Sequence, residues 1–267
     1  MGVYGKCKIK MQSVNLIYFS PTGTSRKVVK AIGQELAAKQ INEFDITQTD
    51  FNYKDFGSGL TIIGIPVYKG RVPAEVIPRL KYFKAKNAPV VLVAVYGNRD
   101  FDDALLELKD LSVELGFIPI AAAAFIGEHS YSIESKPIAK NRPDEADVLK
   151  AKQFAGEILK KLKTKDGIEL KVSGNCPYKV APNAPVMAPR TIADKCTLCG
   201  ICADVCPVDV IELGKTVITN AEACIWCCAC VKACPEEARV FDTPLISQIT
   251  NNLFENCSER KEPEFFL

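Results

Sequence analysis

This chain of 267 residues has only one histidine and one tryptophan. Its formal net charge is also small, at +2. A single histidine excludes histidine-rich zinc sites and argues against Ser-His-Asp catalysis. The near-neutral charge argues against binding nucleic acid through general electrostatics. No apolar run is long enough to span a membrane, and the N-terminus lacks the apolar region of a signal peptide. We therefore expect a cytoplasmic protein.

Strands and helices alternate between residues 14 and 163. Near-continuous apolar runs predict strands at 14–19, 60–68, 89–97 and 117–127, and a weaker run predicts one at 43–47. Runs of this kind are typical of a parallel sheet that helices cover on both faces. We therefore predict an α/β doubly wound domain with five parallel strands. Its ligand site is expected at the carboxyl ends of the strands.

Composition divides the rest of the chain. We predict an N-terminal extension at 1–13, the α/β domain at 14–163, a proline-rich linker at 164–189, a cysteine module at 190–242 and a C-terminal tail at 243–267. Nine of the twelve cysteines lie between residues 196 and 234. This crowding indicates metal ligation, because the cysteines of a disulfide framework are spread across a secreted domain.

Two runs in the module, CTLCGICADVCP at 196–207 and CIWCCACVKACP at 224–235, share the pattern C-x2-C-x2-C-x3-C-P. They repeat at an offset of 28 residues. Three cysteines at this spacing bind one cluster, and the fourth, before the proline, binds the other. We therefore predict two [4Fe-4S] clusters with crossed ligands. The first would be held by Cys196, Cys199, Cys202 and Cys234, and the second by Cys206, Cys224, Cys227 and Cys230.

Structural zinc at two four-thiolate sites is the alternative, although zinc motifs usually have separated C-x2-C pairs. Cys228 lies outside the repeat, and we expect a small buried hydrophobic residue there rather than a redox-active thiol. We expect Trp226 to shield a cluster from water. The module resembles the bacterial-type two-cluster ferredoxins, which have a small α+β fold.

A loop rich in hydroxyl groups follows the first predicted strand. The unpaired N–H groups at the start of the next helix make such a loop suitable for binding phosphate. The loop has no GK[ST] Walker sequence and the domain has no G-x-G-x-x-G, so a monophosphate suits it better than a magnesium nucleotide. An ordinary helix-capping turn is the alternative. The candidate phosphate-binding residues are Ser20, Thr22, Gly23, Thr24 and Ser25.

The pattern S-x-T-G-x-S in this loop resembles the flavodoxins, in which it holds the phosphate of FMN. The resemblance implies that the loops at 65–73 and 96–103 flank the flavin ring. Tyr68 and Tyr96 are the candidates to stack on the ring, and Arg71 and Arg99 to lie at its pyrimidine edge. The full set of candidate flavin-binding residues in these loops, with the single histidine, is Pro66, Val67, Tyr68, Tyr96, Gly97, Asn98, Arg99, Phe101 and His129.

From 14 to 242 the chain resembles the flavodoxin–ferredoxin fusion proteins of anaerobes. The resemblance implies an electron-transfer protein that passes electrons between two [4Fe-4S] clusters and FMN, and on to a redox partner such as a reduced ferredoxin or another iron–sulfur or flavin protein. The sequence offers no convincing catalytic dyad, which fits an electron carrier. The alternative is an FMN-dependent reductase of a small acceptor, with Tyr131, His129 or Tyr96 as proton donor. A redox-silent zinc module is a third possibility.

Charge is divided unevenly, with a net +7 over residues 1–189 and −3 over 190–242. Opposite charges favour docking of the two modules on each other. Two modules with unrelated solvated surfaces are the alternative.

Overall fold

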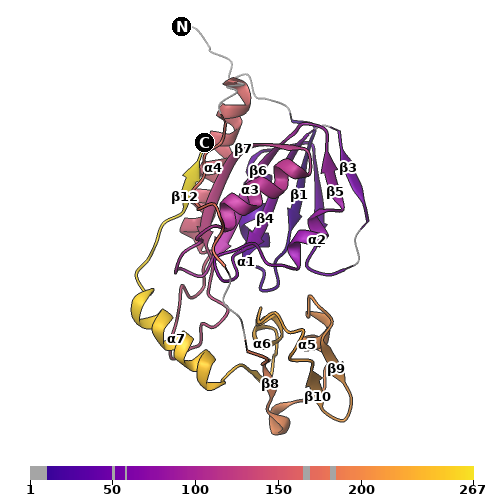
Figure 1. Cartoon of the computed structure of the whole chain (residues 1–267), viewed down its shortest axis with the longest axis vertical. Helices are drawn as coiled ribbons and strands as arrows, with labels where there is room; N and C mark the ends of the chain where they lie inside the picture. The colour runs from indigo at the N-terminus through magenta and orange to yellow at the C-terminus, as the bar shows by residue number, and fades with distance from the viewer. Residues whose placement is uncertain (1–10, 50–51, 58, 165–168, 181–184) are drawn as a thin grey trace.

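A six-stranded sheet forms the centre of the first domain (Figure 1). The computed structural model describes residues 11–49, 52–57, 59–164, 169–180 and 185–267. Five strands are parallel, and they stand in the order β2-β1-β4-β6-β7. This is the 2-1-3-4-5 order of the flavodoxin-like doubly wound fold, which confirms the predicted fold class. The strands are β1 (Ser13–Tyr18), β2 (Gln40–Asp45), β4 (Leu60–Pro66), β6 (Ala88–Tyr96) and β7 (Phe117–Ile126).

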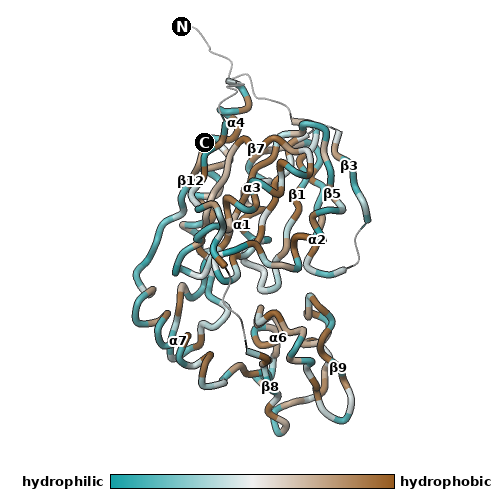
Figure 2. The backbone as a smooth tube through the Cα atoms, in the orientation of Figure 1, coloured by the Kyte–Doolittle hydropathy of each residue, from teal (hydrophilic) through white to brown (hydrophobic). Residues whose placement is uncertain are grey.

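Helices cover both faces of this sheet, which explains why its central strands are apolar on both sides. The helices α1 (Thr24–Glu35) and α4 (Glu145–Thr164) pack on one face. The other face is covered by α3 (Ala104–Glu114) and the short α2 (Val76–Leu80). Figure 2 shows hydrophobic residues concentrated along the strands between these layers. No helix in the described part of the chain is long and apolar enough to cross a membrane.

A second, two-stranded parallel sheet lies beside the main one and was not predicted. It consists of β3 (Lys54–Phe56) and β5 (Phe83–Ala85). Phe56 and Phe83 stack with ring centroids 6.1 Å apart, and Phe44 meets both rings edge-on at 5.5 and 5.6 Å. Aromatic packing rather than strand length therefore stabilises this pair.

The cysteine module contains very short elements and almost no core. Its core consists of Cys202, Cys206, Ile211 and Cys230 with partly buried valines around them. A core this small does not support folding without metal. The elements are β8 (Arg190–Thr191), the 3₁₀ turn Ala193–Lys195, α5 (Ile201–Asp204), β9 (Ile211–Leu213), β10 (Val217–Thr219), α6 (Ala229–Lys232) and β11 (Arg239–Val240).

The predicted linker is extended, but its described residues between 169 and 180 are attached to the first domain. Leu170 is buried in the core of that domain. The Asp103 carboxylate accepts backbone N–H bonds from Asn175 and Lys179 at 2.7 and 2.6 Å. The bond from Lys179 is the main reason why the pKa of Asp103 lies below its usual range. Prolines in the sequence predicted the extended backbone but not these contacts.

The predicted C-terminal tail is ordered and returns to the first domain. It forms α7 (Pro244–Asn256) and then β12 (Glu264–Phe266), which pairs antiparallel with β7 and adds a sixth strand to the predicted five (Figure 1). Phe265 stacks on Phe154 of α4 with ring centroids 4.7 Å apart. The cysteine module is therefore connected to the first domain at both of its ends. Cys7 and most of the predicted N-terminal extension lie outside the described residues.

Candidate metal and cofactor sites

The cysteines of the two runs line two separate small cavities. The first is lined by Cys196, Cys199, Cys202 and Cys234, and the second by Cys206, Cys224, Cys227, Cys230 and also Cys228. Each cavity thus combines three cysteines of one run with the last cysteine of the other, which is the crossed grouping that the spacing predicts. Among the described residues, no three His, Cys, Asp or Glu side chains converge on the position of a single metal ion.

The chemistry of these cavities fits an iron–sulfur cluster. Apart from its cysteines and Thr219, the second cavity is lined by apolar side chains and Pro189. Burial raises the pKa of the Cys227 thiol to about 12, and burial also raises the pKa of Cys230. Thiols in such surroundings ionise when a metal binds them, because the metal supplies the compensating positive charge.

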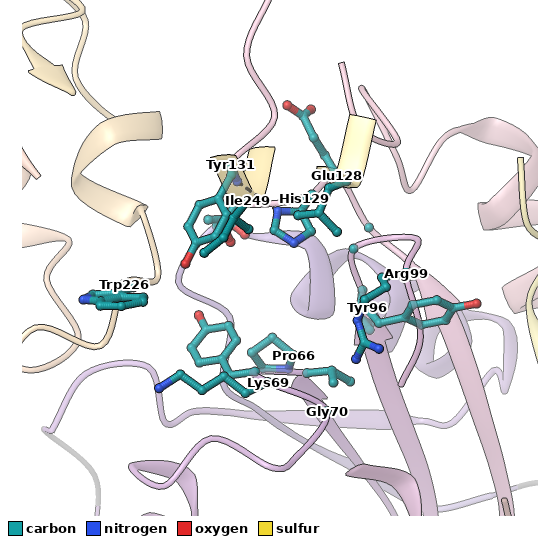
Figure 3. A pocket seen from close by; sticks show the side chains of 18 of the residues that line it. Pro66, Lys69, Gly70, Tyr96, Arg99, Glu128, His129, Tyr131, Trp226 and Ile249 are labelled. Atoms are coloured by element: carbon teal, nitrogen blue, oxygen red, sulfur yellow. Dashed lines mark hydrogen bonds between the residues drawn. The ribbon is translucent and has the colours of Figure 1, made fainter. Parts of the chain in front are cut away.

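A third cavity of about 500 Å³ lies between the first domain and the cysteine module (Figure 3). The carboxyl ends of β4, β6 and β7 open into it, as expected for a doubly wound sheet. The cysteine module contributes Cys224, Ile225 and Trp226, and α7 contributes Leu245, Ile249 and Leu253. We call this space the interdomain cavity. Cys224 and Ile225 line both the interdomain cavity and the second cysteine cavity, so the two spaces adjoin at these residues.

The structure gathers most, but not all, of the predicted flavin-binding residues around this cavity. Those that line it are Thr22, Thr24, Pro66, Val67, Tyr68, Tyr96, Gly97, Arg99 and His129, and those that do not are Ser20, Gly23, Ser25, Asn98 and Phe101. Gly23 still shapes the loop, because its φ of 82° favours glycine. The Ser20 hydroxyl accepts the N–H of Arg26 at 3.0 Å and so closes the start of α1.

Three residues have roles different from those considered for them. Tyr96 borders the interdomain cavity, but its ring is buried against Phe101, so it is not placed to stack on a flavin. The amide of Asn98 donates to the carbonyls of Cys257 and Glu259 in the tail. Arg71 is paired with Glu107 by two bonds of 2.7 and 2.8 Å, away from the cavity.

Trp226 was expected to shield a cluster, and the structure places it at the wall of the interdomain cavity. Its indole N–H donates to the carbonyl of Met187 at 2.8 Å. The Lys69 ammonium lies 5.4 Å from its ring centre, a cation–π distance. In Figure 3 the Tyr131 hydroxyl points toward this tryptophan. Lys69 and the α7 residues were missed, since no sequence pattern connects them to the site.

Cys228 is buried, as expected, and it occupies an unusual backbone position. Its φ of 60° is left-handed, and the matching residue of the first run is Gly200, with φ of 83°. Its thiol donates to the carbonyl of Trp226 at 3.7 Å.

His129 is held in a neutral form at the end of β7. Its Nδ1 accepts the backbone N–H of Tyr131 at 3.0 Å, so the ring proton is on Nε2. A side chain on Gly97 would bring a Cβ within 2.2 Å of the imidazole Cδ2, so glycine is required there. Burial, and then the charges of Lys232 and Arg99, lower the pKa of His129 to about 4.

This pKa makes stability depend on pH in a predictable direction. In the unfolded chain His129 has a pKa of about 6.5, so below that pH the unfolded state binds a proton that the folded state rejects. The contribution of neutral His129 to the free energy of unfolding is complete above pH 6.5. It is lost as the pH falls toward 4, by about 3 kcal/mol in all. Urea unfolding of wild type and His129→Gln across this range measures the difference. Because the chain has one histidine, NMR gives its folded pKa directly, and a value near 6.5 would contradict the expectation.

Among the described residues, three hydrogen-bonded contacts join the two domains. The buried Arg79 guanidinium donates to the carbonyls of Ile46 and Thr47 in the first domain and, at 2.5 Å, to Pro207, which follows Cys206. The Lys232 ammonium contacts the Glu128 carboxylate at 2.8 Å and the Ser132 carbonyl at 2.7 Å. Gln48 donates to the carbonyl of Asp204 at 3.1 Å. These contacts hold the second cysteine cavity next to the interdomain cavity.

Comparison with known proteins supports this division of the chain. Residues 189–212 match the 4Fe-4S binding domain family. The chain joins a flavodoxin-like domain to a 4Fe-4S ferredoxin domain. The cysteine module is thus the ferredoxin domain, although the matched residues include only the first of its two cysteine runs.

Several flavodoxin structures are similar to the first domain at low sequence identity. A short-chain flavodoxin associated with a PDU bacterial microcompartment is 16% identical, with 56% of this chain and 98% of that chain covered and a TM-score of 0.40. A Fusobacterium nucleatum flavodoxin bound to flavin mononucleotide is 15% identical, with coverage of 58% and 99% and a TM-score of 0.38. No curated protein matches the chain by sequence. The fold assignment therefore depends on the strand order described above.

Proposed function

We propose that this protein carries two [4Fe-4S] clusters and FMN and transfers electrons between them inside one chain, and on to a redox partner. The observation that carries the proposal is the position of Cys224. This residue is a proposed ligand of the second cluster and also lines the interdomain cavity at the ends of the β-strands. A cluster bound there would lie against whatever occupies that cavity.

FMN fits the interdomain cavity on the evidence of its phosphate loop. Thr22 and Thr24 line the cavity at the start of α1, where backbone N–H groups point toward an anion. The Ser25 hydroxyl in the same loop is completely buried and has no hydrogen-bond partner in the described structure. Because Ser25 does not itself line the cavity, a bound phosphate would be held by Thr22, Thr24 and the backbone N–H groups of the loop. FMN, when bound, accepts and releases electrons singly or in pairs, which joins one-electron clusters to a two-electron centre.

The positions of the lining residues support an order for the three proposed centres. Cys224, Ile225 and Trp226 bring the second cluster site to the interdomain cavity. The first cluster site is the outer one, because Cys199, Leu198 and Ile201 on its wall are exposed to solvent. We infer that an external redox partner exchanges electrons at the first cluster. The second cluster then connects it to the flavin.

A reductase remains the second candidate function, because the wall formed by α7 is apolar. Leu245, Ile249 and Leu253 face the same cavity as the Tyr131 hydroxyl. Burial raises the pKa of Tyr131 far above its ordinary value, so the phenol stays protonated and available as a hydrogen-bond donor. Saturable turnover of a small acceptor, lost in Tyr131→Phe, would favour this function over simple electron transfer.

Cofactor analysis after anaerobic purification tests the main proposal. We expect about eight iron atoms, eight sulfides and one FMN per chain, as two [4Fe-4S] clusters and one flavin require. After rapid reduction of the clusters, the flavin should be reduced at a rate that does not depend on protein concentration. Zinc in place of iron, or no flavin, would refute the proposal. A rate that rises with protein concentration would show that transfer occurs between chains.

A further inference from the structure

Arg239 is a buried cation located between the two cysteine cavities. It lies on β11, is 2% exposed and lines the first cavity. One terminal nitrogen donates to the Thr191 hydroxyl at 2.6 Å. The other donates to the Thr219 hydroxyl at 2.7 Å and lies 3.8 Å from the sulfur of Cys230, which lines the second cavity. The guanidinium therefore contacts the surroundings of both proposed clusters.

The charge of Arg239 is not balanced by any carboxylate in the described part of the chain. Its hydrogen-bond partners are two neutral hydroxyls and a thiol, and its buried Nε has no partner at all. Burying a charge without a counter-charge is costly. Each [4Fe-4S] core with four thiolates carries a charge of about −2, so the proposed clusters supply what the protein does not.

The internal repeat shows that the fold does not itself need an arginine here. The residue 28 positions earlier is Ile211, which is also buried and lines the second cavity as Arg239 lines the first. One half of the module thus has an apolar side chain, and the other half has a cation, at equivalent places. This asymmetry indicates a role for the charge beyond packing.

We propose that Arg239 is the shared counter-charge of the two clusters and raises the reduction potential of both. This rests on the proposed function, since it requires two bound clusters. Reduction of a cluster adds one electron from the donor and forms or breaks no bond, so its charge becomes more negative by one. A fixed cation beside the cluster stabilises this more negative state. Arg239 exchanges no electron itself and acts on the clusters only through its fixed charge.

Potentiometric titration with dithionite, followed by electron paramagnetic resonance, tests the role of Arg239. In Arg239→Gln the ratio of reduced to oxidised cluster, measured at the wild-type midpoint potential, should fall about tenfold. This corresponds to a midpoint potential lower by about 59 mV for a one-electron couple. Arg239→Lys should keep the wild-type potentials. The matched control is Arg190→Gln, which removes the same charge. Arg190 lies on the paired strand β8 and forms an exposed ion pair with Asp242. It should shift neither potential measurably.

The outcomes separate this inference from the proposed function. Unchanged potentials in Arg239→Gln, with full iron and sulfide, would overturn the inference and leave the proposed function intact. Wild-type protein without two clusters would overturn both. If Arg239→Gln does not retain its clusters, Ile211→Lys provides the reverse test. A cation placed there should raise the potential of the second cluster, and no rise in a fully loaded variant would overturn the inference.

Discussion

Cys206→Ala is expected to remove the second cluster and to slow reduction of the flavin by about 100-fold or more. Replacing a residue that only supports a metal ligand already lowers metal affinity or activity by up to about 100-fold. Cys206 lies in the first cysteine run but lines the cavity of the second. That cavity adjoins the interdomain cavity through Cys224. Loss of this cluster breaks the only proposed link between the first cluster and the flavin. Iron and sulfide analysis with stopped-flow measurement of flavin absorbance provides the test.

Cys234→Ala is the matched control, because Cys234 is also the last cysteine of its run and precedes a proline. It lines the first cavity, so the variant should keep the second cluster and lose the first. With dithionite, which reduces the second cluster directly, flavin reduction should then remain fast. With a reduced ferredoxin as donor it should be slow, since the outer cluster is missing. If Cys206→Ala instead lost the outer cluster, the ligands would not be crossed.

Asp147→Ala is expected to lower the free energy of unfolding by about 3–5 kcal/mol, the usual cost of leaving one member of a buried ion pair alone. The side chains of Asp147 and Arg142 are 0% and 5% exposed. The guanidinium Nε donates to the carboxylate at 2.8 Å, and the backbone N–H of Asp144 donates to it at 2.9 Å. Removing the carboxylate leaves the Arg142 charge buried without its partner. Urea unfolding with linear extrapolation measures the loss.

The same helix α4 offers a control pair at its surface. Glu157 and Lys160 are 41% and 72% exposed, and Glu157→Ala should change stability by at most about 0.5 kcal/mol. The Asp147 variant should also loosen the His129 loop, because the backbone N–H of Glu128 donates to the carbonyl of Arg142 at 2.8 Å. FMN affinity would then fall together with stability. A loss of less than 1 kcal/mol would show that water or another group compensates Arg142.

Features encoded in local pattern were predictable, and features that depend on docking were not. The apolar runs predicted the four inner parallel strands because helices on both faces remove the alternation of polar residues. The edge strand β2 is mostly exposed and lies at 40–45, whereas the weaker run predicted it at 43–47. The cysteine spacing predicted which thiols gather around each cavity. By contrast, the contact of Trp226 with Lys69 forms only when the two domains are docked, and no local sequence pattern predicts it.

The place of Tyr96 in its strand was readable from the sequence. Tyr96 shares a face of β6 with Leu92 and Ala94, which pack in the core beneath α3, so its two-residue period already predicted a buried ring. The net charges of the domains, which left docking and unrelated surfaces both open, do not predict individual contacts. At Lys232 and Glu128 the acidic domain provides the cation and the basic domain provides the anion. Net charge describes a whole surface, whereas a contact depends on the few groups that meet.

The strand β12 gives the chain an unusual order of assembly. Because it pairs with β7, the flavodoxin-like sheet receives its outer strand only after the whole ferredoxin domain has been synthesised. Until then β7 presents an open edge, the kind of surface on which chains aggregate. In topological terms the ferredoxin domain is an insertion within the first domain rather than an appendage. Protection of that edge thus depends on a segment that follows both cysteine runs in the chain.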